Sequence, residues 1–211
     1  MSGNSRPGDY CHSRHRERFL TRIIAGKAGG RRLAVPSEGT RPTSDRVREA
    51  LFSALAHDPG LEGAVVLDLC AGSGALGLEA LSRGAAHATF VEMDRRAVAV
   101  LRRNVEAVGL GGDVRYGPAG TVLETAPGRA HDLVLVDPPY AEPDEAIARW
   151  LRTGRRTGWI SDDAVVVVER ARSTGAFGWP EGVEGLRERR YGDTVIHVGG
   201  CYGPAMPGET R

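Results

Sequence analysis

The tetrapeptide Asp137-Pro138-Pro139-Tyr140 combines residue types that could hold a flat base by its amino group. It follows the apolar run 133–136, which predicts a buried parallel strand. Two consecutive prolines fix φ and lack amide donors, so the backbone is rigid and its carbonyls can accept hydrogen bonds. We expect Asp137 and the Pro138 carbonyl to accept the two N–H bonds of an exocyclic amine while Tyr140 stacks on the ring. The alternative is an ordinary strand-to-loop turn with a packed tyrosine.

A glycine-rich loop lies upstream, between a predicted strand and a predicted helix. Gly72, Gly74 and Gly77 match the pattern G-x-G-x-x-G, and Glu92 follows Gly72 by twenty residues at the end of the next strand. Glycines let a backbone approach a ligand closely, and a carboxylate at this spacing can accept the protons of two ribose hydroxyls. The pattern alone also fits a dinucleotide-binding dehydrogenase.

Three features argue against a dehydrogenase. Asp68 ends the strand before the loop, Asp137 follows another strand, and the last predicted strands form a hairpin instead of a second mononucleotide-binding half. A cationic cofactor that lacks a pyrophosphate is better served by an acidic rim than by a phosphate cradle. We therefore favour S-adenosylmethionine as the cofactor, with S-adenosylhomocysteine as its product.

Charge is distributed unevenly along the chain. Residues 1–57 contain ten Arg and one Lys against five acidic residues, although the whole chain of 211 residues has a net charge of only +1. A basic segment of this kind is typical of a surface that faces nucleic acid, while a general bias toward Arg is the competing explanation. No apolar run is long enough to span a membrane and no signal-peptide core is present, so a cytoplasmic location is expected. Three widely spaced cysteines support neither a disulfide framework nor a metal site.

The elements that must position these residues alternate between strand and helix from residue 63 onward. Such alternation predicts an α/β fold with a mostly parallel sheet of seven strands and crossover helices. The last two strands, joined through Gly192-Asp193, predict an antiparallel hairpin that closes the sheet. The predicted strands are 64–69, 89–92, 114–116, 133–136, 164–169, 186–191 and 194–198. The predicted helices run from 76 toward Gly84, from the Asp94 cap to Gly109, and through 147–151.

A small extension precedes this region. Segments 22–26 and 31–36 predict two short strands around a glycine-rich turn, and a helix capped by Thr43 or Ser44 follows and ends within 56–59. We expect a disordered basic arm at 1–20, the hairpin and helix extension at 21–58, the main domain at 59–203 and a disordered tail at 204–211. A monomer is expected.

From about Arg22 to its end, the chain resembles the bacterial 16S ribosomal RNA guanine-N2 methyltransferases. Four segments carry the resemblance: 22–26 with 30–33, 41–52, 68–74 and 137–140. The resemblance implies a Rossmann-like class I methyltransferase that modifies one guanine of small-subunit ribosomal RNA, as bare RNA or as an assembled particle. It implies catalytic roles for Asp137, Pro138 and Tyr140, with Tyr140 also contacting the substrate.

The resemblance also implies a set of binding residues. The cofactor would be contacted by Asp68, Gly72, Gly74, Glu92, Met93 and Ala119. Independently of the resemblance, the basic charge of the N-terminal hairpin and arm predicts RNA contacts by Arg31, Arg32 and Arg41. One departure concerns the adenine ring. Where such enzymes often have Asp or Asn after the third strand, this chain has Gly117-Pro118-Ala119, so only the Ala119 backbone is available for that contact.

Two other functions remain open at this point. A non-catalytic RNA-binding module would need the basic N-terminal region but would give Asp137 no task. A DNA adenine-N6 or cytosine-N4 methyltransferase would use Asp-Pro-Pro-Tyr in the same way, because its target is also an exocyclic amine. Such an enzyme needs a sequence-reading domain, and the N-terminal extension is small for direct readout.

Overall fold

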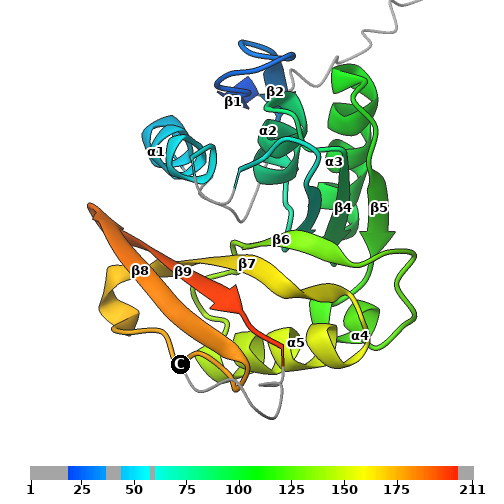
Figure 1. Ribbon diagram of the computed structural model, residues 1–211. Coiled ribbons are helices and arrows are strands. Elements are labelled where there is room, and N and C mark those ends of the chain that lie inside the picture. Colours follow the sequence, from blue (N-terminus) through cyan, green and yellow to red (C-terminus); the bar gives the residue numbers. More distant parts are fainter. Residues whose placement is uncertain (1–18, 37–43, 58–59, 204–211) are drawn as a thin grey trace, which may run out of the picture.

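The fold is described from a computed structural model, which defines residues 19–36, 44–57 and 60–203. Figure 1 shows a central twisted sheet with helices on both faces. The predicted arm at 1–20, apart from its last two residues, the predicted tail and Arg41 lie outside the described residues. The division at residue 58 stays a prediction.

A seven-stranded sheet with the order β5-β4-β3-β6-β7-β9-β8 forms the centre of the molecule. Strands β3 to β7 run parallel to one another, whereas β9 is antiparallel to both β7 and β8. The predicted α/β fold with a closing hairpin is thereby confirmed. The strands are β3 Val65–Leu69, β4 His87–Glu92, β5 Asp113–Tyr116, β6 His131–Val136, β7 Ile160–Ala171, β8 Val183–Tyr191 and β9 Thr194–Cys201.

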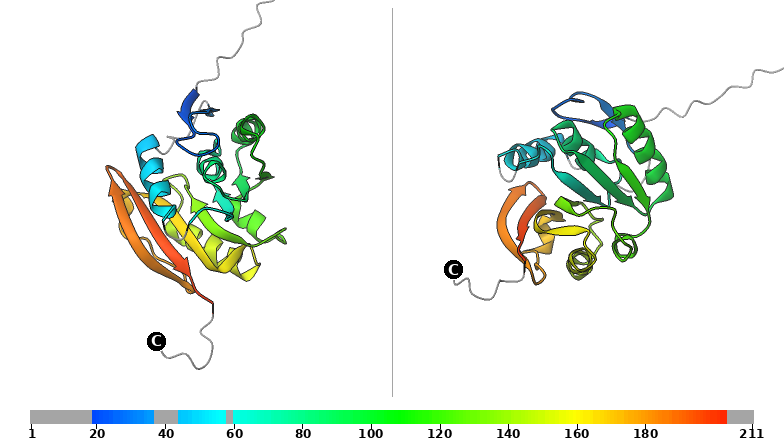
Figure 2. Two further views of the ribbon diagram at one scale, coloured as in Figure 1. Left: turned by 45° about the horizontal axis from the view of Figure 1, so that its top comes forward. Right: turned by 45° about the vertical axis from the view of Figure 1, so that its right-hand side comes forward.

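Helices cover both faces of the sheet (Figures 1 and 2). Helices α1, α2 and α3 pack on one face and α4 and α5 on the other, and each face has its own core of buried apolar side chains. A short 3-10 turn, η1, follows β7. The bounds are α1 Asp45–Leu55, α2 Ala75–Ser82, α3 Arg95–Val108, α4 Ala119–Leu123, α5 Asp144–Arg156 and η1 Arg172–Thr174.

Local signals set both ends of α3 and the start of α1, as predicted. The Asp94 carboxylate accepts a hydrogen bond from the Ala97 amide at 2.8 Å, and Gly109 ends α3 in the left-handed conformation. Ser44, one of the two predicted caps, caps α1 by accepting the Val47 amide. Helix α4 was not predicted, because its five residues are too few to show a periodicity.

The N-terminal hairpin consists of β1 Phe19–Arg22 and β2 Arg32–Ala34, which pair antiparallel. The prediction of a first strand over 22–26 is wrong in its position, because β1 ends at Arg22. The amides of Ile24 and Ala25 instead donate to the buried Glu79 carboxylate of α2, at 2.6 and 3.1 Å. The hairpin is thus bonded to α2 and is integrated into the main body at this point.

Candidate active site

The carboxyl ends of three adjacent parallel strands form the centre of the candidate site. β3 lies between β4 and β6, so that Leu69 pairs with Val91 on one side and with Val136 on the other. The Asp137 amide then lies 3.4 Å from the Leu69 carbonyl and donates to it. The glycine loop after β3, Glu92 at the end of β4 and Asp137 after β6 therefore meet at one edge. This is the edge at which open parallel sheets bind ligands.

The three glycines of the loop are required for different reasons. Gly72 and Gly74 have φ angles of +55° and +81°, which residues with side chains rarely adopt. The space beside Gly72 is open, whereas a side chain at Gly74 would collide with Leu101 and one at Gly77 with Phe90. Gly72 is therefore needed for its conformation, Gly77 for close packing, and Gly74 for both.

Glu92 is held as a hydrogen-bond acceptor at the end of β4. Its Oε2 accepts the Gly72 amide, and its Oε1 accepts the amides of Met93 and Asp94, each at 2.8 Å. A carboxylate oxygen can accept about two hydrogen bonds, so Oε2 retains capacity for one more donor. The position predicted for a ribose contact is thus fixed beside the glycine loop.

Asp68 lies beneath the loop and is 1% exposed. Its Oδ2 accepts the Gly77 amide at 2.9 Å, and its Oδ1 is buried with no hydrogen-bond partner in the described part of the chain. Burial raises the pKa of Asp68 to about 8 against the lowering effect of the Gly77 amide, and the charges of Asp137 and Glu92 add to the rise. Three carboxyl groups thus lie close enough to influence one another, and a bound cation would be favoured among them.

The segment after β6 presents the groups predicted to hold a base. Pro138 is buried, Asp137 is partly exposed, and the Tyr140 ring is 52% exposed. The Glu142 amide donates to the Pro139 carbonyl at 2.9 Å, which closes a turn around Tyr140. An exposed aromatic ring on a turn stiffened by two prolines is well placed for stacking.

Arg170 of β7 anchors the far end of this segment, a role that was not predicted from the sequence. Only 2% of Arg170 is exposed; its Nη2 donates to the Glu142 carbonyl at 2.7 Å, and its Nε lies 2.8 Å from the Asp144 carboxylate in an ion pair. The two contacts hold the stretch that runs from Tyr140 into the first turn of α5. The only available signal was an arginine directly after the apolar strand pattern.

Asn104 of α3 is a second residue whose role was not predicted from the sequence. It is 4% exposed, and its side chain bonds both the amide and the carbonyl of Ala34 in β2, at 3.0 and 2.9 Å. Its Nδ2 also donates to the Ser73 carbonyl at 2.8 Å. One buried amide therefore links the N-terminal hairpin, α3 and the glycine loop.

The chain after β5 lies beside Glu92. The Gly117 amide donates to the Glu92 carbonyl at 3.0 Å, and Met93, directly after Glu92, is 64% exposed. Ala119 is the first residue of α4, so its amide has no partner within that helix. The predicted cofactor contacts of Met93 and of the Ala119 backbone, the latter to the adenine ring, stay predictions.

The structure does not bring Arg31, one of the predicted RNA-binding arginines, to this edge. Arg31 donates to the carbonyls of Ala107 and Val108 at the C-terminal end of α3. Since α3 has fourteen residues and begins beside Glu92, Arg31 lies about 20 Å away along the helix. Arg32 is exposed on β2. A contact of Arg31 with RNA would therefore be remote from Asp137.

No helix in the described ranges is long and apolar enough to cross a bilayer. Within the same residues, no group of three His, Cys, Asp or Glu side chains is arranged to hold a metal ion.

Comparison with known proteins identifies the family. The model of the family described as conserved hypothetical protein 95 matches residues 21–200. Ribosomal RNA small subunit methyltransferase D of Escherichia coli K12 is 42% identical over 178 residues, which cover 84% of this chain and 88% of that protein. The protein of the same name from Haemophilus influenzae is 37% identical over 155 residues, covering 70% of this chain and 77% of that one.

A solved structure of the Escherichia coli protein yhhF has the same fold. It superposes with a TM-score of 0.76 at 38% identity and covers 86% of this chain and 98% of its own. The sequence relatives and this structure agree with the resemblance carried by the glycine loop and the Asp-Pro-Pro-Tyr segment. The chain therefore belongs to the family described as conserved hypothetical protein 95, together with the ribosomal RNA small subunit methyltransferases D.

Proposed function

We propose that this protein transfers a methyl group from S-adenosylmethionine to the exocyclic N2 amine of a guanine in small-subunit ribosomal RNA. The observation that carries the proposal is that Asp137 and Tyr140 follow β6 at the same sheet edge as the glycine loop and Glu92. The glycine loop and Glu92 suit a nucleoside that carries a positive charge, and Asp137 with Tyr140 suits a base that carries an exocyclic amine. The names of the relatives support the RNA substrate.

The residues present fit S-adenosylmethionine. The open space beside Gly72 leaves room for a ligand against the loop, and Oε2 of Glu92 can accept a ribose hydroxyl. The carboxyl groups around Asp68 favour a ligand that carries sulfonium and ammonium charges. The Met93 side chain and the Ala119 amide are available to the adenine ring. The bound cofactor supplies an electrophilic methyl group.

Asp137 and the Pro138 carbonyl activate the target amine. The amine of guanine is a weak nucleophile, because its lone pair is delocalised into the ring. When each of these two acceptors binds one N–H, the lone pair turns out of the ring plane toward the methyl group. The Asp137 carboxylate also stabilises the positive charge that develops on nitrogen.

Tyr140 and Asp137 then complete the reaction. Stacking on Tyr140 holds the extruded base flat and is worth about 1–3 kcal/mol. The methylated nitrogen is cationic and strongly acidic, so Asp137 accepts its proton directly or through a water molecule. Arg170 keeps the turn that carries Tyr140 in place through the Glu142 carbonyl and Asp144.

Labelled methyl transfer to three substrates tests this function. Bare 16S ribosomal RNA, small-subunit particles from cells that lack the endogenous activity, and genomic DNA are incubated with the protein and then digested for mass spectrometry. We expect N2-methylguanosine from the RNA or the particle. A methyl group on adenine or cytosine of DNA would instead identify a DNA amino-methyltransferase, and no transfer to any of the three would exclude both.

A further inference from the structure

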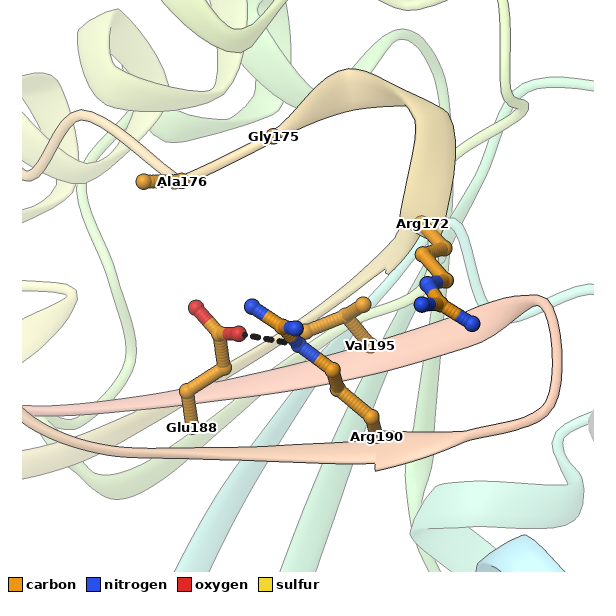
Figure 3. A pocket seen from close by; sticks show the side chains of 6 residues that line it. All are labelled: Arg172, Gly175, Ala176, Glu188, Arg190 and Val195. Carbon is orange, nitrogen blue, oxygen red and sulfur yellow. Dashed lines mark hydrogen bonds and ion pairs between the residues drawn. The ribbon is translucent and has the colours of Figure 1, made fainter.

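A pocket of about 150 Å³ opens between η1 and the β8–β9 hairpin. Figure 3 shows the side chains of Arg172, Arg190 and Glu188 gathered around Val195, beneath the segment Gly175–Ala176. None of the roles derived above involves this pocket. Its lining residues are Arg172, Gly175, Ala176, Glu188, Arg190 and Val195.

The pocket is on the same edge of the sheet as Asp137. Val136 of β6 pairs with Val168 of β7, and β7 continues for three more residues to Ala171, a further rise of about 10 Å. The hairpin turn between β8 and β9 is paired with this extension, because Thr194 lies opposite Ala171. The tip of the hairpin therefore extends beyond the end of β6, which Asp137 directly follows.

A row of paired residues connects the pocket to the turn that carries Tyr140. Arg170 pairs with Val195, and Val195 pairs with Arg190, so the three side chains lie on one face of the sheet. Adjacent strands are about 4.8 Å apart, which puts the backbone of Arg190 about 10 Å from that of Arg170. Arg170 on β7 bonds the Glu142 carbonyl of the predicted base-binding turn. Val195, which lines the pocket, lies on β9, the next strand of the sheet.

The charges of the pocket favour an anion. The Arg172 side chain is exposed and forms no ion pair with any described residue. The Arg190 guanidinium, 66% exposed, is held by Glu188 at 2.9 Å. The pocket lining thus carries two guanidiniums and one carboxylate. The Arg172 amide bonds the Asp193 carbonyl at 2.7 Å, which fixes this arginine to the hairpin turn. Planar guanidiniums match the oxygens of a phosphate group and bind them in pairs.

We propose that this pocket binds a backbone phosphate of the same RNA whose target base is held by Asp137 and Tyr140. The proposal rests on the proposed function, and it assigns a substrate contact to the C-terminal hairpin in addition to the N-terminal arginines. The contact orients a nucleotide that flanks the target on the Arg170 side of the site. Because it is made to a phosphate and not to a base, its contribution to RNA binding is electrostatic and independent of base identity.

The test compares Arg172→Gln, Arg190→Gln and the double variant with wild type in RNA binding and single-turnover methylation over a series of salt concentrations. Arg129→Gln is the matched control, because Arg129 is exposed in the loop before β6, at the opposite edge. We expect each pocket variant to raise the half-saturating RNA concentration severalfold and to lower the salt slope on single-stranded RNA by about 0.7 for each arginine that is neutralised. S-adenosylhomocysteine affinity and the thermal midpoint should match the control.

Arg172→Lys and Arg190→Lys separate charge from packing, because the lysine variants should restore most of the salt slope. Pocket variants with the half-saturating concentration and salt slope of Arg129→Gln would overturn the proposal, and in that case wild-type formation of N2-methylguanosine would leave the proposed function standing. If the pocket variants kept the wild-type salt slope and the wild-type protein methylated a base other than guanine, both the phosphate contact and the proposed function would be overturned. A wild-type protein that binds no RNA would also contradict both.

Discussion

Replacing Arg170 by Met should release the turn that carries Tyr140 while leaving the cofactor half of the site intact. The change removes the hydrogen bond to the Glu142 carbonyl at 2.7 Å and the ion pair with Asp144 at 2.8 Å. A hydrogen bond from a charged donor is worth about 1.5–3 kcal/mol. The Asp144 side chain is 30% exposed, so its ion pair adds less than a fully buried pair would. We expect the free energy of unfolding to fall by about 2–4 kcal/mol.

The effect on activity should exceed the effect on cofactor binding. A displacement of about 1 Å in a positioning group can cost about 100-fold in rate, so single-turnover methyl transfer by Arg170→Met should fall by this order. Calorimetry should give an S-adenosylhomocysteine affinity within about twofold of wild type. The control is Arg152→Met on α5, where an exposed pair with Glu145 at 4.0 Å should contribute less than about 0.5 kcal/mol. Equal rates for the two variants would refute the positioning role of Arg170.

Three further predictions concern the cofactor half. Glu92→Ala should weaken S-adenosylmethionine binding by about 1.5–3 kcal/mol, because it also frees the Gly72 amide; calorimetry showing an unchanged affinity would contradict it. The pKa of Asp68 is raised from 3.8 to about 8, so its contribution to stability is fully present below the lower value and is lost as the pH rises through the higher one. Asp68→Asn should remove that part of the pH dependence from denaturant unfolding curves, and an identical pH profile would argue against it. Asn104→Ala should raise KM for S-adenosylmethionine more than KM for RNA, since Asn104 bonds the Ser73 carbonyl of the loop, and steady-state kinetics with each substrate varied checks this split.

Helix α3 shows what the sequence alone could establish about the fold. Its Asp94 cap, its apolar spacing and its Gly109 terminus are all local, and the structure has all three. The position of β1 depends instead on Glu79, which is more than fifty residues from the amides it binds. No local pattern contains that contact, so the boundary of the first strand was wrong.

The site shows the same division between local and distant information. Glu92 ends one predicted strand and Asp137 follows another, and the edge at which they meet follows from parallel strand order alone. Asn104 and Arg170 instead join segments that are 70 and 28 residues apart. Their roles depend on which helix and strand lie beside the loops, and this is known only from the folded chain.

The most direct test of the proposed chemistry is single-turnover methyl transfer to small-subunit ribosomal RNA by Asp137→Ala, with Tyr140→Phe and Tyr140→Ala measured in parallel. Asp137→Ala should bind S-adenosylhomocysteine normally but lose about 2.7–4 kcal/mol of transition-state stabilisation, or about 100- to 1,000-fold in rate. Tyr140→Phe should retain most activity because the stacking ring remains, whereas Tyr140→Ala should lose the stacking contribution. A near-wild-type rate for Asp137→Ala would show that the carboxylate neither orients the amine nor stabilises its charge.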